Sequence, residues 1–196
     1  MAASDIYSSL HSRICTDYSA KNDSLDSVSE GGVVRAARGN LVESMIDTIA
    51  DALGLEARVG SKDFQTITVT DKRTGKVHSQ KHQVDRHIYH KGKLVAIVEC
   101  KAYLDSCYYV RACSDFARMK MAHPDIKCFL FALEDSISEE SRVFTDAESN
   151  YVCDDIFFLC EGKRSSAKPI YKKEFAKPLL ADRLKRFIQA MESLVV

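Results

Sequence analysis

The chain has 196 residues, of which 45% are hydrophobic and 29% are charged, and its 28 basic side chains equal its 28 acidic ones. This composition is typical of one ordinary folded domain with a hydrophobic core, and it excludes collagen-like, disordered and disulfide-stapled small proteins. Because no run of about 18 apolar residues predicts a membrane span, and the N-terminal segment lacks the pattern of a secretory signal, we expect a cytoplasmic protein without a membrane partner.

The seven cysteines include no C-x-x-C pair and lie mostly in apolar runs, so we expect reduced residues, mostly in the core. The charge is unevenly distributed. Residues 31–101 hold 12 basic and 8 acidic side chains, residues 102–162 hold 5 and 12, and residues 163–186 hold 9 and 2. Two basic segments flanking an acidic one fit a protein with one face for a polyanion, and they fit solvated charges on unrelated faces equally well.

The first long helix is predicted over residues 33–53. Apolar residues recur there at three- and four-residue intervals, Gly54 follows as a stop, and Gly39 is a candidate break. The preceding residues 1–30 are rich in Ser and Asp and only weakly periodic, so they predict an N-terminal arm or extension.

Three strands are predicted next. Alternating β-branched residues at 64–70 predict the first strand, and the turn residues DKRTGK separate it from a second run at 77–89. The third strand, residues 94–100, has the near-continuous apolar sequence LVAIVEC that is typical of a central strand covered on both faces. The charged residues Glu99 and Lys101 at its end are therefore conspicuous.

The second half of the chain alternates helices and strands. The pattern predicts a helix from the N-cap Asp105 to residue 122, a strand at 126–133, a short helix at the capping-box pattern Ser136-x-x-Glu139, a strand at 155–160 and an amphipathic helix after Pro178. A hairpin followed by helix-separated strands predicts an α/β fold with a central mixed five-stranded sheet flanked by helices. We expect one domain over residues 1–196, with its core at 31–160 and a basic loop and amphipathic helix at 161–196.

One group of residues indicates chemistry. Asp85 lies near the end of one hairpin strand, and Glu99 and Lys101 lie at the end of the next, on one face because side chains alternate along a strand. A loop at residues 91–93, with Gly92 left-handed or beside a bulge, would place Asp85 opposite Glu99. Two converging carboxylates repel unless a hard divalent cation such as Mg²⁺ lies between them, and that arrangement is typical of phosphodiester hydrolysis. The alternative is a surface ion-pair cluster.

These residues resemble the active site of the PD-(D/E)XK nuclease superfamily, in which an Asp and a (D/E)-x-Lys motif lie across a β-hairpin. Here thirteen residues separate Asp85 from Glu99-Cys100-Lys101, and Val84 stands where the motif has Pro. The resemblance covers roughly residues 31–160 and implies an αβββαβ core with Asp85, Glu99 and Lys101 as catalytic residues. It also implies a Mg²⁺ site, where Mn²⁺ would substitute, held by Asp85, Glu99 and the backbone carbonyl of Cys100.

The resemblance further implies that a Glu on the first core helix joins the metal site. Glu43 is the best match for this catalytic residue, and Asp47 is the alternative. Glu43 lies at the edge of the predicted apolar stripe, from which it would point into the cleft. Otherwise it is a solvated helix residue or pairs locally with Arg35 or Arg38.

Candidate phosphate contacts come from two Lys- and Arg-rich segments near predicted turns and from one helix face. Gln83 and His87 share the face of Asp85 by alternation, and they suit substrate contact and cross-strand pairing equally. Zinc is not expected, because the histidine spacings match no zinc signature. The DNA-binding candidates are Lys81, Gln83, His87, Arg111, Arg118, Lys163, Arg164, Lys172 and Lys173.

Within the superfamily, a stand-alone chain of this size is most like a type II restriction endonuclease. The resemblance implies Mg²⁺-dependent cleavage of double-stranded DNA at a specific sequence, 5′-phosphate ends and a homodimer. The C-terminal helix or the helix after Lys101 is the candidate dimer interface. The alternatives are a structure-selective or repair nuclease such as a junction resolvase, and a non-catalytic DNA-binding protein on the same fold.

Overall fold

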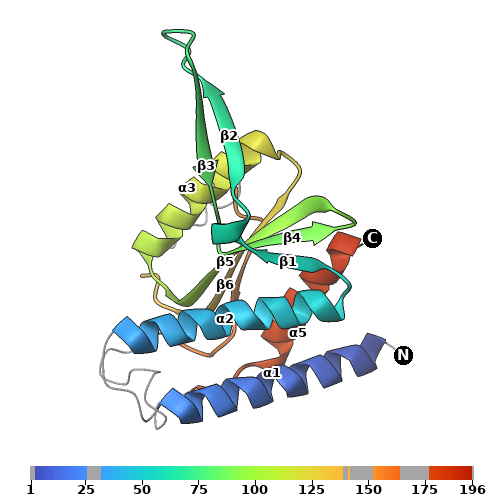
Figure 1. Ribbon diagram of the computed structural model, residues 1–196. Helices are drawn as coiled ribbons and strands as arrows, with labels where there is room; N and C mark the ends of the chain where they lie inside the picture. Colours follow the sequence, from blue (N-terminus) through green and yellow to red (C-terminus); the bar gives the residue numbers. More distant parts are fainter. Residues whose placement is uncertain (1–2, 26–31, 139–140, 142–151, 164–176, 196) are drawn as a thin grey trace.

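A mixed five-stranded sheet lies at the centre of the computed structural model, which describes residues 3–25, 32–138, 141, 152–163 and 177–195 (Figure 1). The strand order is β1–β4–β5–β6–β7; β1, β4 and β5 pair antiparallel, and β5, β6 and β7 pair parallel. The predicted fold, a mixed five-stranded sheet flanked by helices, is confirmed. The elements are α1 (Ala3–Leu25), α2 (Gly32–Ala52), β1 (Glu56–Val59), η1 (Gly60–Lys62), β2 (Gln65–Thr70), β3 (Val77–His82), β4 (Arg86–His90), β5 (Lys93–Leu104), α3 (Ser106–Ala122), β6 (Lys127–Asp135), β7 (Asp155–Phe158), α5 (Ala181–Glu192) and η3 (Ser193–Val195).

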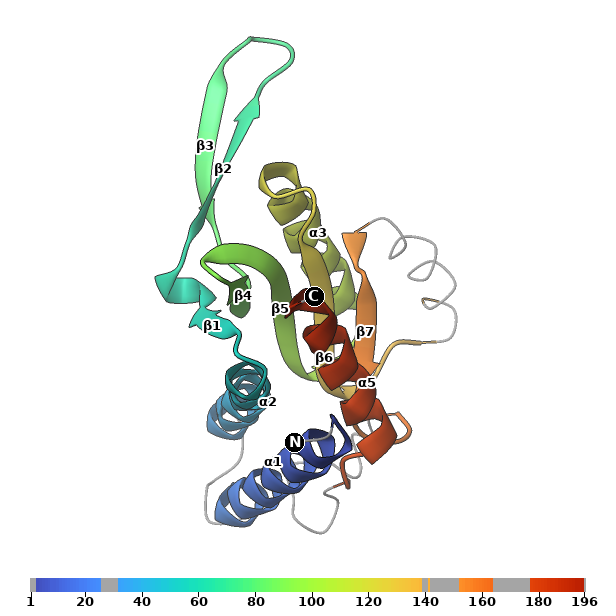
Figure 2. The same cartoon turned by 90° about the vertical axis from the view of Figure 1, so that its right-hand side faces the viewer.

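Helices cover both faces of the sheet. The elements α1, α2 and α5 lie on one face and α3 on the other (Figure 2). Along β6, Phe129 and Phe131 pack in the core cluster of α1, α2 and α5, whereas Cys128 and Leu130 pack in the cluster of α3. Because both faces of the central strands are buried, their sequences read as continuous apolar runs.

The prediction of one strand over residues 77–89 is wrong. The chain leaves β3 at His82 and enters β4 at Arg86, and β3 belongs to a separate two-stranded sheet with β2. The first strand of the main sheet is therefore β1, which the sequence analysis did not predict, and residues 64–70 supply β2 instead. Both runs alternate and carry β-branched residues, so local pattern alone does not tell which sheet a strand joins.

The two-stranded sheet is a long hairpin, which we call the β2–β3 ribbon (residues 65–82). It is inserted between β1 and β4 and projects beyond the body of the molecule (Figures 1 and 2). Its root is anchored by Ile67 and His82, which are buried, while the remaining strand residues are exposed apart from the partly buried Gln65.

The N-terminal segment folds as the helix α1, which packs against α2 and α5. Its buried residues Leu10, Ile14 and Tyr18 recur every four residues on an otherwise polar helix, and that narrow stripe is the signal in a segment the sequence analysis treated as weakly periodic. The helix α2 runs without a break through Gly39 and ends before Gly54, whose φ is +70°. The short helix predicted at Ser136-x-x-Glu139 extends outside the described residues.

The C-terminal helix α5 packs its apolar stripe into the core of this chain. Phe187 lies between aromatic rings of β6 and β7, with ring centroids 4.3 Å from Phe131 and 4.9 Å from Phe157. This apolar stripe of α5 is therefore covered by the core of the same chain, and it does not supply the predicted dimer interface. None of the seven cysteines, which all lie in the described residues, forms a disulfide, and four of them are buried, which confirms the prediction of mostly core thiols. Among the described helices, none combines the length and apolarity needed to span a membrane.

Candidate active site

The β4–β5 hairpin brings Asp85 beside Glu99. Arg86 pairs with Val98 across the hairpin, so Asp85, one residue before β4, lies next to Glu99 on β5. The backbone amide of Cys100 donates to Asp85 Oδ2 at 2.8 Å. The carboxylate of Asp85 is thereby held at the end of β5 by the backbone that carries the E-x-K motif.

This register arises from a shorter turn than the sequence suggested. The turn has two residues, Lys91 and Gly92, both with positive φ (51° and 78°), because His90 pairs with Lys93. A bulge at Val95, where the register shifts between Ile88 and Tyr89, adds the missing residue. The two deviations cancel, so the pairing predicted for Asp85 and Glu99 is present.

Lys101 lies between the two carboxylates. Its ammonium donates to Glu99 Oε1 at 2.5 Å, to Asp85 Oδ2 at 3.1 Å and to the carbonyl oxygen of Cys100 at 3.0 Å. These three oxygen groups are the ones the sequence analysis assigned to a metal ion. Their arrangement around the ammonium shows that they converge on a point where a cation is stabilised.

Burial and mutual charge shift the pKa values of the side chains in this cluster. The pKa of Glu99 is raised, first by burial and then by the charge of Asp85. Burial alone would lower the pKa of Lys101, but Glu99 and Asp85 outweigh it and raise that pKa, so Lys101 stays cationic. Two carboxylates and one ammonium leave one negative charge uncompensated, which favours the binding of a further cation.

The predicted helix carboxylates Glu43 and Asp47 both bind Arg86. Arg86 donates to Glu43 Oε2 at 2.6 Å and to both oxygens of Asp47, at 2.7 and 3.0 Å, and the side chain of Arg86 is only 7% exposed. Sequence reasoning missed this residue, because Arg86 begins a strand with two histidines, directly after Asp85, and nothing local distinguishes it from an exposed polar residue. Within the described residues, no group of three or more His, Cys, Asp or Glu side chains is placed to hold a metal, so Asp85 and Glu99 stand without a third carboxylate.

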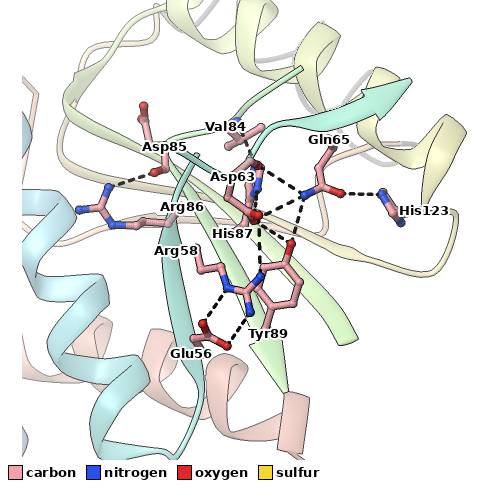
Figure 3. Close-up of polar contacts among 10 residues, drawn as sticks. All are labelled: Glu56, Arg58, Asp63, Gln65, Val84, Asp85, Arg86, His87, Tyr89 and His123. Carbon is pink, nitrogen blue, oxygen red and sulfur yellow. Dashed lines mark hydrogen bonds and ion pairs between the residues drawn. The ribbon is translucent and has the colours of Figure 1, made fainter. Parts of the chain in front are cut away.

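A buried polar network holds the turn before Asp85 (Figure 3). The amide of Val84 donates to His87 Nε2 at 3.2 Å, and His87 Nδ1 lies 3.0 Å from Asp63 Oδ2. The hydroxyl of Tyr89 donates to the same carboxylate at 2.7 Å. His87 is fully buried and has both ring nitrogens engaged. Because His87 has no exposed surface, it is not available to DNA in this structure, which corrects its prediction as a DNA contact.

The network predicts acid sensitivity of folding. Burial lowers the pKa of His87 in the folded protein despite Asp63 beside it, so below the unfolded value of about 6.5 the unfolded chain binds the proton first. Stability is therefore expected to fall as the pH drops below about 6.5. Urea unfolding of the wild type and of His87→Gln at several pH values measures this, with a smaller loss expected for the variant. Parallel profiles of the two proteins would contradict it.

Gly60 also fixes the turn before Asp85. The Gly60 amide donates to the carbonyl of Asp85 at 3.2 Å, and a Cβ on Gly60 would lie 1.7 Å from the carbonyl oxygen of Val84. Gly60→Ala is therefore expected to displace the turn and to cost about 3 kcal/mol of unfolding free energy. Gly39→Ala is the matched control, because its Cβ would meet nothing within 4 Å, and it is expected to stabilise α2. Equal thermal midpoints of both variants would contradict this assignment.

A cleft of about 810 Å³ opens above the carboxylates. Its walls come from α3, from the root of the β2–β3 ribbon and from the segment before it, and Glu43 reaches it from α2. Four of the predicted DNA contacts, Lys81, Gln83, Arg111 and Arg118, line this cleft together with Asp85 and Glu99. Lys163 lines a separate hollow beside β7 and α5. Arg164, Lys172 and Lys173 lie outside the described residues.

A comparison with known sequences shows which class of protein the chain resembles. The chain is 28% identical to the type II restriction enzyme DdeI of Desulfomicrobium norvegicum, over 84% of this chain and 83% of that protein. The chain is similar to a type II restriction enzyme. The resemblance predicted from the sequence is thus confirmed, and with it the prediction of an enzyme of the nuclease class. No family model matches the chain.

Two solved structures are also similar to this nuclease-like chain. NucC of P. aeruginosa in its cAAA-bound form has a TM-score of 0.50 at 14% identity, covering 98% of this chain and 92% of that one. The BbvCI A2B2 tetramer has a TM-score of 0.47 at 13% identity, covering 91% and 86%. The similarity to NucC supports the fold alone.

Proposed function

We propose that the chain is a Mg²⁺-dependent endonuclease that hydrolyses double-stranded DNA at a specific sequence and leaves 5′-phosphate ends, as a type II restriction endonuclease. The observation that carries the proposal is the convergence of Asp85, Glu99 and the Cys100 carbonyl on one cation position, where the Lys101 ammonium lies in the free protein. Asp85 and Glu99 also line a cleft with Lys81, Arg111 and Arg118. The similarity to DdeI supports the same class of reaction.

The donor set fits Mg²⁺. Hard oxygen ligands are those that Mg²⁺ prefers, and one or two carboxylates completed by substrate phosphate oxygens and water are its usual protein ligands. Asp85, Glu99 and the Cys100 carbonyl would hold the ion in place of the Lys101 ammonium, which they bind in the free protein. When bound there, Mg²⁺ supplies charge neutralisation at the scissile phosphate and lowers the pKa of a coordinated water. Glu43 lines the same cleft, and its Oε2 accepts a hydrogen bond from Arg86.

Each site residue has a role that follows from its charge state. Asp85 and Glu99 bind as carboxylates and are held in place by the Cys100 amide and by Lys101. Lys101 is cationic, so it donates hydrogen bonds to the attacking water and stabilises the negative charge that develops on the phosphate, and it is not the base. Lys81, Arg111 and Arg118 on the walls bind flanking phosphates of the duplex.

A homodimer would give each DNA strand its own active site. Two-fold symmetry of the protein then matches the two strands of a palindromic sequence. Because the apolar stripe of α5 is filled by the core, the remaining predicted interface is α3, which exposes Met121 near its C-terminal end, outside the residues that line the cleft. Sedimentation equilibrium of the free protein tests this assembly, and a monomer at all concentrations would contradict it.

The test of the function is cleavage of a mixed-sequence plasmid. The wild type with Mg²⁺ is expected to give discrete fragments, and the same protein with EDTA is expected to leave the plasmid uncut. A continuous smear of fragments would support nuclease activity and would contradict cleavage at a specific sequence. A plasmid that stays intact with Mg²⁺ would contradict cleavage of linear duplex, and branched DNA assayed beside it would then distinguish a structure-selective nuclease from a non-catalytic protein.

A further inference from the structure

We propose that the β2–β3 ribbon is a DNA-binding arm that enters the major groove next to the cleavage site. The proposal rests on the proposed function, because it states how a duplex in the cleft would be held and read. The ribbon begins at the wall of the cleft, where Lys81 and Phe64 line it. From there it projects past the body of the molecule (Figure 1).

The dimensions of the ribbon fit a DNA groove. Each strand has six residues, which gives a length of about 20 Å at about 3.3 Å per residue. The major groove of B-DNA is about 12 Å wide and admits a two-stranded ribbon. An isolated hairpin is only marginally stable in water, so the exposed outer half of this one adds little to the stability of the domain. Its role is then at the surface.

The charge of the ribbon is complementary to DNA. Between residues 65 and 82 the chain has four Lys or Arg residues and a single acidic residue, Asp71, in a protein whose net charge is zero. Asp71 is occupied by the turn, since it accepts from the amides of Arg73 and Thr74 at 2.8 and 3.3 Å and from the Thr74 hydroxyl at 2.7 Å. Lys72, Arg73 and Lys76 are exposed at the tip, where they suit phosphate contacts.

One face of the ribbon carries groups that suit base edges. The register places Thr66, Thr68 and Thr70 on the same face as Ser79 and Lys81. The hydroxyls of Thr68 and Ser79 lie 3.0 Å apart across the two strands. Hydroxyl groups both donate and accept hydrogen bonds, and threonine methyl groups contact thymine methyl groups. This face therefore offers side chains for reading bases.

The opposite face is used by the protein itself. Ile67 belongs to the core cluster of α3, and His82 Nε2 lies 3.4 Å from Asp115 of α3. The root is also joined to the turn before Asp85, because Asp63 contacts His87 and Gly60 donates to the Asp85 carbonyl. These contacts fix the ribbon relative to Asp85, so bases bound by the ribbon would lie at a fixed distance from the phosphate that is cut.

Two ribbon variants test the arm. The first replaces the tip cations (Lys72→Gln, Arg73→Gln, Lys76→Gln), and its charge-matched control replaces exposed cations on α1, β5 and α5 (Arg13→Gln, Lys93→Gln, Lys185→Gln). The second replaces residues 70–77 by Asn-Gly, which closes the hairpin at the Val69–His78 pair with a two-residue turn. Thermal unfolding of all three proteins checks that the body, including Ile67 and His82, stays folded.

The readout is equilibrium binding of a labelled mixed-sequence duplex, with Ca²⁺ in place of Mg²⁺, as a function of salt. The tip variant is expected to reduce the slope of log affinity against log salt by about 2 to 3, while the control keeps the wild-type slope. In a second duplex, glucosylated 5-hydroxymethylcytosine replaces every cytosine, so that glucose groups occupy the major groove. Glucosylation is expected to weaken binding by the wild type and to leave the shortened ribbon variant unaffected.

Wild-type slopes in both ribbon variants would overturn the arm, and an equal effect of glucosylation on all proteins would overturn its placement in the major groove. Plasmid cleavage by the same preparations separates the two proposals. A wild type that binds through the ribbon and cuts no DNA would overturn the proposed function alone. A wild type that cuts, with ribbon variants that bind as it does, would overturn the arm alone.

Discussion

Replacing Lys101 by Met is expected to lower the rate of DNA cleavage by about 10³-fold and to leave duplex binding nearly unchanged. Among the described residues, the ammonium of Lys101 is the one positive charge that contacts the carboxylates of both Asp85 and Glu99, and these raise its pKa. In the proposed function Lys101 acts on charge that develops during the reaction, so its removal is expected to affect the rate more than the ground-state affinity. Single-turnover cleavage and equilibrium binding on one duplex measure the two effects.

The matched control for this experiment is Lys93→Met. Lys93 is exposed at the start of the same strand, on the side of the hairpin turn. The Lys93→Met variant is expected to cleave DNA at the wild-type rate. If Lys101→Met also cleaves at the wild-type rate, the assignment of the reaction to this cluster is wrong. If it fails to bind DNA at all, the residue acts in binding and the proposed catalytic role is wrong.

Removing the two carboxylates that bind Arg86 is expected to destabilise the fold more than removing Arg86 together with them. Glu43→Ala with Asp47→Ala removes both carboxylates from a guanidinium that is 7% exposed in the wild type, and among the described contacts it keeps its hydrogen bond to the Asp85 carbonyl. An uncompensated buried charge costs about 3–5 kcal/mol. Adding Arg86→Met removes that charge, so the triple variant is expected to recover part of the loss. Urea unfolding midpoints of the two variants measure the difference.

The control for this ion pair is Glu56→Ala. Glu56 binds Arg58 at 2.7 Å, but the two side chains are 56% and 40% exposed, so its loss is expected to leave the urea unfolding midpoint nearly unchanged. A triple variant less stable than the double would show that the guanidinium contributes through packing and not through its charge. A double variant as stable as Glu56→Ala would contradict the burial of Arg86.

The hairpin that carries Asp85, Glu99 and Lys101 could be predicted because its geometry is local. Side-chain alternation and a Gly in the turn are enough to set which residues face one another, and a two-residue turn with a bulge gave the same pairing as the expected longer loop. The helix after the motif could be predicted for the same reason, since the N-cap Asp105 accepts from the Tyr108 amide three residues later.

The parts that could not be predicted depend on distant contacts. Arg86 meets Glu43 and Asp47 across about 40 residues of sequence, and only the packing of α2 beside β4 brings them together. His87 and Gln83 follow the same alternation along the chain. His87 is nevertheless buried and contacts Asp63, whereas Gln83 lines the cleft. The assignment of β2 and β3 to a separate ribbon likewise depends on which strand pairs with β4, and β1 takes that place.

The central claim is that Asp85 and Glu99 bind the metal ion used for cleavage. Isothermal titration of Mg²⁺ into the free protein tests it without reference to any DNA sequence. The wild type is expected to bind, Asp85→Asn and Glu99→Gln are each expected to weaken binding by about 10-fold or more, and the exposed control Glu56→Gln is expected to bind as the wild type does. Equal Mg²⁺ affinity in all four proteins would contradict the site.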